Sequence, residues 1–152
     1  RLYHSARFGH DAENPMLASM FLGYPWLVRG YDSGSFTVDE CETGDCAEFD
    51  RLLGSRLVLA NAELRLPLVG PFGLLRTYVF PPIEIAGFYD VGAAWRQGEP
   101  SPFQSGGRDP VSSHGVALRV NLFSFVLEAN LVHPNDRPRK GWYWQLNLQP
   151  GF

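Results

Sequence analysis

The chain has 152 residues, a net charge of −3 at neutral pH, and a composition that is 19% charged and 14% aromatic. The negative net charge argues against a nucleic-acid-binding surface, while the many aromatic residues, 16 glycines and 12 prolines favour strands and turns over helices. No apolar run approaches the roughly 18 residues that a membrane-spanning helix needs, so any crossing of a membrane must use strands of about 9–11 residues.

The first third of the chain holds one predicted strand and one long loop. Residues 1–9 form a strand of mixed character, and the turn-forming sequence DAENP ends it. Residues 17–55 keep neither a helical nor a strand period, and a loop of that length in a compact domain is usually functional. No signal peptide is visible, so we interpret a chain that begins at Arg1 as a mature or truncated product.

The two cysteines, Cys41 and Cys46, lie in the acidic stretch DECETGDCAEF. A zinc site would normally use four Cys or His ligands, and a redox pair would more often read C-x-x-C, so neither is indicated. A small disulfide across an exposed loop is the better interpretation and implies an oxidising compartment, with two unpaired thiols as the alternative. The acidic residues match no EF-hand spacing, so we predict a solvated loop and no metal site.

Alternating side chains predict two strands after this loop. In residues 55–68, Glu63 lies on the polar face together with Asn61 and Arg65. In residues 83–95, Asp90 and Gly92 lie on the face opposite the apolar side chains. Both strands are therefore expected to be apolar on one surface and polar on the other.

Three more strands complete the prediction. Residues 112–134 are expected to form a hairpin with a two-residue turn at Phe123 and Ser124. Counting outward from that turn places Arg119 opposite Glu128, and opposite charges across a ladder are favourable. The apolar face of the last strand and the end of the chain carry Trp142, Trp144, Leu146, Leu148 and Phe152.

The polar faces distinguish a soluble sandwich, which would bury the apolar face, from a membrane barrel, which would turn it toward lipid. A solvated sheet face usually carries scattered lysines, yet Lys140 is the only lysine in the chain. Acidic and arginine side chains with Asn and Gln suit instead a polar lumen in which charges pair. The apolar faces carry aromatic residues where an interfacial girdle would lie, namely Tyr89, Trp95, Trp142 and Trp144. We therefore predict an all-β, transmembrane antiparallel β-barrel.

Four segments resemble the bacterial surface-antigen barrel, the BamA/TamA type of outer-membrane assembly and translocation protein. They are LVRGY (residues 27–31), NAELRLP (61–67), GFYDVGAAW (87–95) and the final strand with its terminal Phe152. The resemblance covers nearly the whole chain. It implies a single domain over residues 1–152 that forms the C-terminal portion of a barrel of sixteen strands, with residues 17–55 as a long extracellular loop folded into the lumen.

The resemblance also assigns roles to residues. Arg29 corresponds to the arginine of the family's loop motif, with Glu63 and Asp90 as its acidic partners on the barrel wall, near Gly92. A guanidinium between two carboxylates supplies charge-assisted bonds that can hold a long loop inside a wide barrel. We expect Gly30 to allow close approach of the backbone and Tyr31 to pack the loop tip, and we expect Arg119 and Glu128 to pair in the lumen. The alternative is an ordinary surface arginine in a turn.

The implied function is insertion or translocation of proteins at the bacterial outer membrane through a lateral seam between the first and last strands. The implied partners are outer-membrane lipid, client outer-membrane or secreted proteins, and the assembly machinery that recognises the C-terminal strand. Six strands cannot close a membrane barrel, for which about eight is the minimum, so we expect missing N-terminal strands or other copies of the chain to complete it.

Two other functions stay open, and both are passive. The first is an export pore or structural membrane barrel for a fused passenger domain, and the second is a soluble ligand-binding β-barrel. No G-x-S-x-G, H-E-x-x-H or phosphate-binding motif is present, and the four histidines are scattered, so we predict no enzyme activity and no cofactor.

Overall fold

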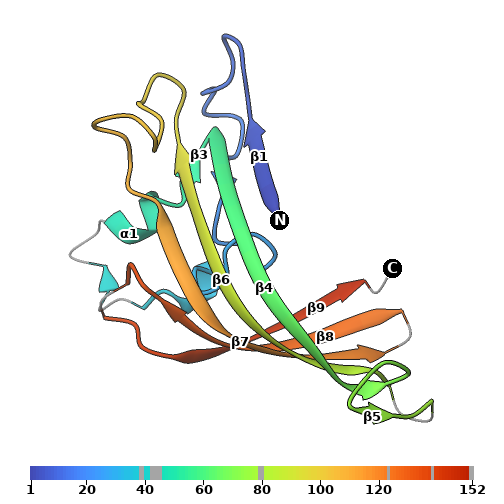
Figure 1. The fold of residues 1–152 in the computed structure, drawn as a ribbon. Coiled ribbons are helices and arrows are strands. Elements are labelled where there is room, and N and C mark those ends of the chain that lie inside the picture. Colours follow the sequence, from blue (N-terminus) through green and yellow to red (C-terminus); the bar gives the residue numbers. More distant parts are fainter. Residues whose placement is uncertain (38–39, 42–45, 79–80, 123, 138, 151–152) are drawn as a thin grey trace.

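The computed structural model describes residues 1–37, 40–41, 46–78, 81–122, 124–137 and 139–150. Its main feature is one strongly curved antiparallel sheet (Figure 1), with strand order β1-β4-β6-β7-β8-β9. The strands are β1 (Leu2–Ala6), β4 (Arg56–Gly70), β6 (Ile83–Trp95), β7 (Val111–Leu122), β8 (Phe125–Pro134) and β9 (Tyr143–Pro150). The two-residue strand β5 (Leu75–Arg76) pairs with the end of β4 in parallel. Within the described residues, the sheet is open and has β1 and β9 at its edges.

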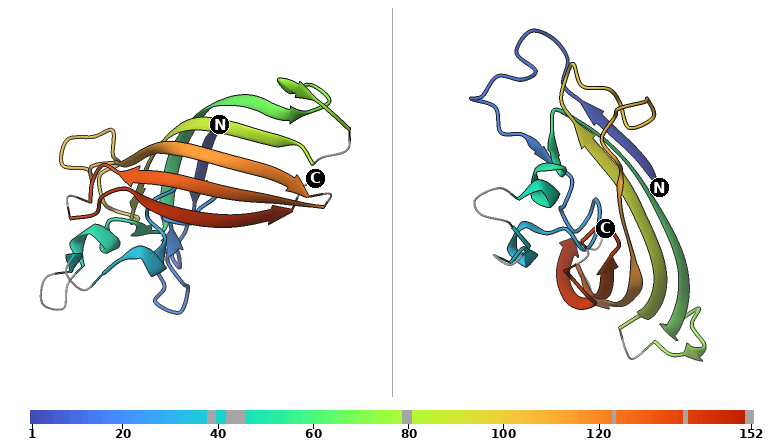
Figure 2. Two further views of the ribbon diagram at one scale, coloured as in Figure 1. Left: turned by 90° about the horizontal axis from the view of Figure 1, so that it is seen from below. Right: turned by 90° about the vertical axis from the view of Figure 1, so that its left-hand side faces the viewer.

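The described residues between positions 20 and 54 lie on the concave side of this sheet (Figure 2). We call residues 20–54 the inner segment. It contains the strand pair β2 (Met20–Phe21) and β3 (Leu53–Gly54), the 3₁₀ turn η1 (Ser33–Ser35) and the single-turn helix α1 (Ala47–Asp50). These short elements show no extended period, which is why the sequence pattern predicted only a loop. In the described part of the chain, no helix has the length and apolar character needed to cross a membrane.

The two faces of the sheet differ as the alternation predicts. The convex face exposes a continuous set of apolar side chains, formed by Leu64, Leu66, Ile85, Tyr89, Val116, Leu118, Leu127, Trp144, Leu146 and Leu148. The concave face buries charged and amide side chains, formed by Asp90, Glu128, Asn130 and Gln145. An exposed apolar surface of this extent on a monomeric sheet indicates contact with lipid or a partner.

The register of the hairpin is the predicted one. Arg119 lies opposite Glu128, and Leu122 lies opposite Phe125. Phe123, one of the two predicted turn residues, lies outside the described residues. The predicted pairing of opposite charges across the ladder is therefore confirmed.

The predicted position of Trp95 in an exposed aromatic girdle is wrong. Its side chain is buried, with 6% of the residue exposed, and the ring of His4 in β1 stacks on it at 6.3 Å between centroids. Alternation identifies the face on which a side chain lies but not what covers that face. Tyr89, Trp142 and Trp144 are exposed on the apolar face as expected.

The inner segment is held to the sheet first by apolar packing. A buried cluster joins Leu22, Val28 and Leu52 of the segment to Leu59 of β4 and Ala94 of β6. This contact is close because β6 carries a glycine, Gly92, near its carboxyl-terminal end. A Cβ atom on Gly92 would lie only 3.0 Å from Leu22 Cδ1 and from Val28 Cγ2.

Gly92→Val should therefore push the inner segment away from β6. We expect a loss of about 1–3 kcal/mol of folding free energy, as for other insertions into a packed core. The measurement is the temperature at which the full-length protein in detergent loses its folded electrophoretic band. Gly87→Val on the same strand is the matched control, because a Cβ atom there meets nothing within 4 Å. Equal midpoints for the two variants would contradict the packing role of Gly92.

Candidate functional site

The site is built around the buried guanidinium of Arg29, which the inner segment presents to the sheet. Only 4% of Arg29 is exposed, and Asp90 on β6 is fully buried. The Nε atom of Arg29 donates to Asp90 Oδ2 at 2.7 Å, and Nη2 donates to Oδ1 at 2.9 Å. The backbone N–H of Arg29 also donates to Oδ2, at 3.3 Å. This bidentate pairing is the strong form of an arginine–carboxylate contact.

The third nitrogen of Arg29 faces two further carboxylates. Nη1 lies 2.8 Å from Glu63 Oε1 on β4 and 3.7 Å from Glu128 Oε1 on β8. The ring of Phe88 on β6 lies beneath the guanidinium, 3.6 Å from Cζ to the ring centroid. Arg29 therefore contacts carboxylates of three strands and the face of one aromatic ring, which adds a cation–π contact.

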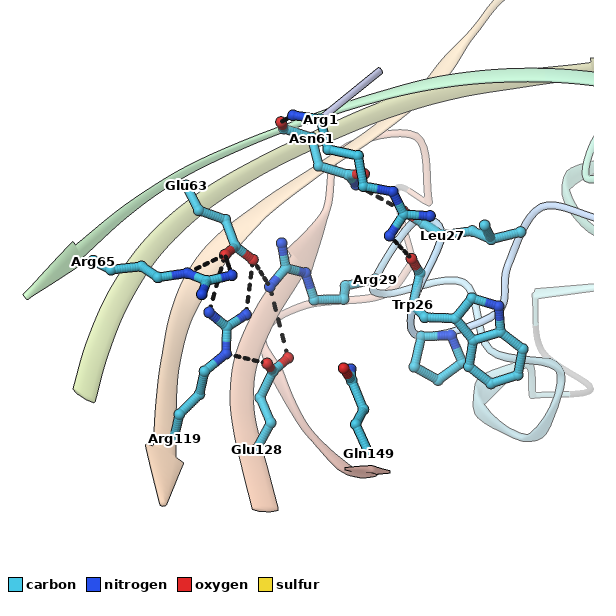
Figure 3. Close-up of a pocket in the computed structure, with 11 residues that line it drawn as sticks. Arg1, Trp26, Leu27, Arg29, Asn61, Glu63, Arg65, Arg119, Glu128 and Gln149 are labelled. Atoms are coloured by element: carbon cyan, nitrogen blue, oxygen red, sulfur yellow. Dashed lines mark hydrogen bonds and ion pairs between the residues drawn. The ribbon is translucent and has the colours of Figure 1, made fainter. Parts of the chain in front are cut away.

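Arg119, an arginine of the sheet itself, completes the network (Figure 3). Arg119 donates to both oxygens of Glu63, at 3.0 and 2.9 Å, and also pairs with Glu128. Arg65 pairs with Glu63 at 2.8 Å from a more exposed position. Three arginines thus face the three carboxylates of Glu63, Asp90 and Glu128. All of these residues except Asp90 line a cavity of about 320 Å³. This balance of charge is what buried ionic groups require.

The charge of Arg29 is maintained by these partners. Burial alone would lower the pKa of Arg29, but the hydrogen bonds and charge of Asp90, with the charges of Glu63 and Glu128, raise it above its ordinary value. The paired charges and hydrogen bonds are suited to holding the inner segment against the sheet.

The two residues after Arg29 lie where the resemblance implies. Gly30 has a φ of +90°, which favours glycine, and a Cβ atom there would be 3.0 Å from Val132 Cγ2. The Tyr31 side chain is buried, and its hydroxyl donates to the Ser112 carbonyl oxygen at 2.7 Å. Burial, with the charge of Asp136, raises the pKa of Tyr31, so its hydroxyl remains protonated.

The structure thus brings together Arg29, Glu63 and Asp90, and it places Gly92 two residues further along the same strand. The pair Arg119 and Glu128, predicted as a separate lumen pair, belongs to the same network. Sequence reasoning missed two participants, Phe88 and Asn61. Both lie on the predicted polar face, the same face as Glu63 and Asp90, and this position in the strand alternation was the signal that could have identified them. The amide of Asn61 donates to Asp90 Oδ1 at 2.9 Å and to the Leu27 carbonyl oxygen at 2.7 Å.

The remaining predicted site residues lie away from this network. Cys41 and Cys46 form a disulfide in the inner segment. Trp142, Trp144, Leu146 and Leu148 are exposed on the convex face along β9, and Phe152 lies outside the described residues. Among the residues that the structure describes, no group of three or more His, Cys, Asp or Glu side chains is placed to hold a metal ion.

A curved antiparallel sheet with an apolar convex face, a charged concave face and a polypeptide segment inside defines the class of transmembrane β-barrels. The model of the Omp85 superfamily domain matches residues 2–150, and the chain belongs to this superfamily. No curated protein and no solved structure matches the chain. Members of this superfamily are proteins of the bacterial outer membrane that assemble or translocate other proteins. They are transporters and insertases that work with outer-membrane clients and assembly partners.

Asp90→Asn should strongly destabilise the protein, because it removes the charge that neutralises Arg29 and replaces one acceptor oxygen by an amide. We expect a loss of about 3–5 kcal/mol, as for other broken buried ion pairs. Arg65→Ala is the control, since the Arg65 side chain is 58% exposed and its pair with Glu63 should contribute less than about 1 kcal/mol. Thermal or denaturant midpoints of the purified full-length protein measure both. A midpoint for Asp90→Asn as high as that for Arg65→Ala would be inconsistent with a structural ion pair.

Proposed function

We propose that the protein is an insertase or translocase barrel of the outer membrane, in which residues 17–55 are an extracellular loop folded into the lumen and anchored by Arg29. The observation that carries this proposal is the buried bidentate bond between Arg29 and Asp90, which are 61 residues apart. A desolvated arginine with three carboxylate partners keeps the inner segment against the wall, where it narrows the interior.

The size of the inner segment supports a wide barrel. A barrel of about eight strands has an interior that side chains alone can fill. The inner segment brings its own strand pair and helix to the concave face and still leaves a cavity beside Glu63 and Arg119. A complete barrel around this segment must therefore have considerably more than eight strands, in keeping with the sixteen that the resemblance implies.

The proposal places the lateral seam at β9. Among the described residues, β9 pairs with β8 and ends the strand order. Backbone groups along its other edge need a partner in lipid, because unsatisfied donors and acceptors there are costly. A first strand that pairs weakly with this edge can be replaced by a client strand, which adds to the sheet by β-augmentation.

Arg29→Ala should loosen the inner segment, because it leaves three carboxylates without their cation. We expect reduced resistance of the folded electrophoretic band to heating and reduced amounts of the protein in the outer membrane. The matched control is Arg65→Ala, which removes an arginine at the exposed end of the same network. Unchanged heat-modifiability of the Arg29 variant would contradict the anchoring role.

The insertase function is tested by crosslinking at the edge of β9. A photoreactive amino acid at Gln149, in the full-length protein in cells, should capture partly folded outer-membrane clients, whereas the same probe at Gln97, an exposed residue in the β6–β7 connection, should not. A passive export pore would yield no client crosslinks at β9 while still displaying a fused passenger. That outcome would overturn the insertase proposal.

A further inference from the structure

A second buried arginine, Arg137, lies in the connection between β8 and β9 and binds the inner segment. Arg137 is only 1% exposed, and all five of its side-chain N–H groups have acceptors. Nε and Nη2 donate to the two oxygens of Glu40, both at 2.8 Å. Nη1 donates to the Gly30 carbonyl oxygen at 2.9 Å and to Ser35 Oγ at 2.8 Å, and Nη2 donates to the Ser35 carbonyl oxygen at 3.0 Å.

Other contacts make this pair a closed unit. The ring of Phe36 lies 3.8 Å from Arg137 Cζ, on the face of the guanidinium. The amide N–H and hydroxyl of Thr37 donate to Glu40. Lys140 donates to the Ser35 carbonyl oxygen at 2.6 Å and lies 3.8 Å from Glu40. Burial acts to raise the pKa of Glu40, but the hydrogen bonds and charge of Arg137 hold it below its ordinary value.

The same face of the inner segment also binds the beginning of β9. Asp32 accepts hydrogen bonds from the Tyr143 hydroxyl at 2.9 Å and from Gln145 Nε2 at 2.7 Å. On the other side of the connection, Asp136 accepts from the Ser112 amide at 2.6 Å and contacts the Tyr31 hydroxyl. The inner segment therefore binds the β8–β9 connection and, near the start of β9, Tyr143 and Gln145 through charged and hydrogen-bonding groups.

We propose that Arg137 and Glu40 form a clamp that fixes the amino-terminal end of β9 to the inner segment, so that the last strand moves at its carboxyl-terminal half, residues 146–150. The inference goes beyond Arg29, which contacts neither β9 nor the β8–β9 connection by any of the bonds described above. The part of this inference that concerns movement of β9 at the lateral seam rests on the proposed function. If β9 separated from its neighbouring strand near Tyr143, the buried guanidinium of Arg137, with all five of its donors satisfied, would be exposed. Separation near Leu148 leaves the clamp intact.

The clamp is tested by hydrogen–deuterium exchange of the full-length protein in liposomes. In the unaltered protein, amides of residues 143–145 should exchange at least tenfold more slowly than those of residues 147–149. Arg137→Ala and the milder Glu40→Gln should each accelerate exchange at residues 143–145 at least tenfold, and the double variant should add little to either. Arg51→Ala is the control, because the Arg51 side chain also extends from the inner segment and donates to the Asp109 carbonyl oxygen in an exposed hydrogen bond.

Two results would overturn the proposal. One is unchanged exchange at residues 143–145 in both clamp variants. The other is acceleration that appears equally in residues 57–61 of β4, because that pattern reports general unfolding. The exchange measurement tests the clamp and does not depend on client assembly. The crosslinking at Gln149 tests the insertase function separately, so the failure of one proposal can be distinguished from the failure of the other.

Discussion

The structure depends on the neutralisation of a positive charge that the inner segment buries against the sheet. Arg29 cannot be left unpaired in a low-dielectric interior, so its position requires carboxylates at fixed points on the wall. Asp90, Glu63 and Glu128 supply them from three different strands. Arg119 then balances the excess of negative charge on the wall. One ion-pair network thus sets both the register of the strands that carry it and the place of the segment that they hold.

This network is compatible with a membrane location because the two faces of the sheet are chemically separate. Apolar side chains cover much of the convex face, and the charged groups of the network lie on the concave face, where they pair with one another. The same alternation that directs Leu64 and Leu66 outward directs Glu63 and Arg65 inward. A slip of one residue in β4 would exchange the two sets, which would put charges into lipid and remove the partners of Arg29.

Periodicity and the resemblance predicted the sheet and the Arg29 contacts well, because strand parity determines which side chains share a face. The opposition of Arg119 and Glu128 followed from counting residues outward from a turn. Trp95 was misplaced because parity does not reveal that His4 covers it. The clamp was missed because Glu40 and Arg137 are 97 residues apart and lie outside regular strands, where no period relates them. The short strands and the helix of the inner segment have too few residues to produce a pattern.

The long sequence separation of the clamp has a consequence for assembly. Glu40 and the carbonyl oxygen of Gly30 acquire their cation only when the final hairpin has docked, since Arg137 lies between its two strands. Contacts between residues so far apart form late, after the loop between them has been ordered. Until then the carboxylate of Glu40 has the local Thr37 donors but no cation, and it favours water over the interior. Before that docking, this part of the inner segment therefore lacks the cation that holds it in the folded protein.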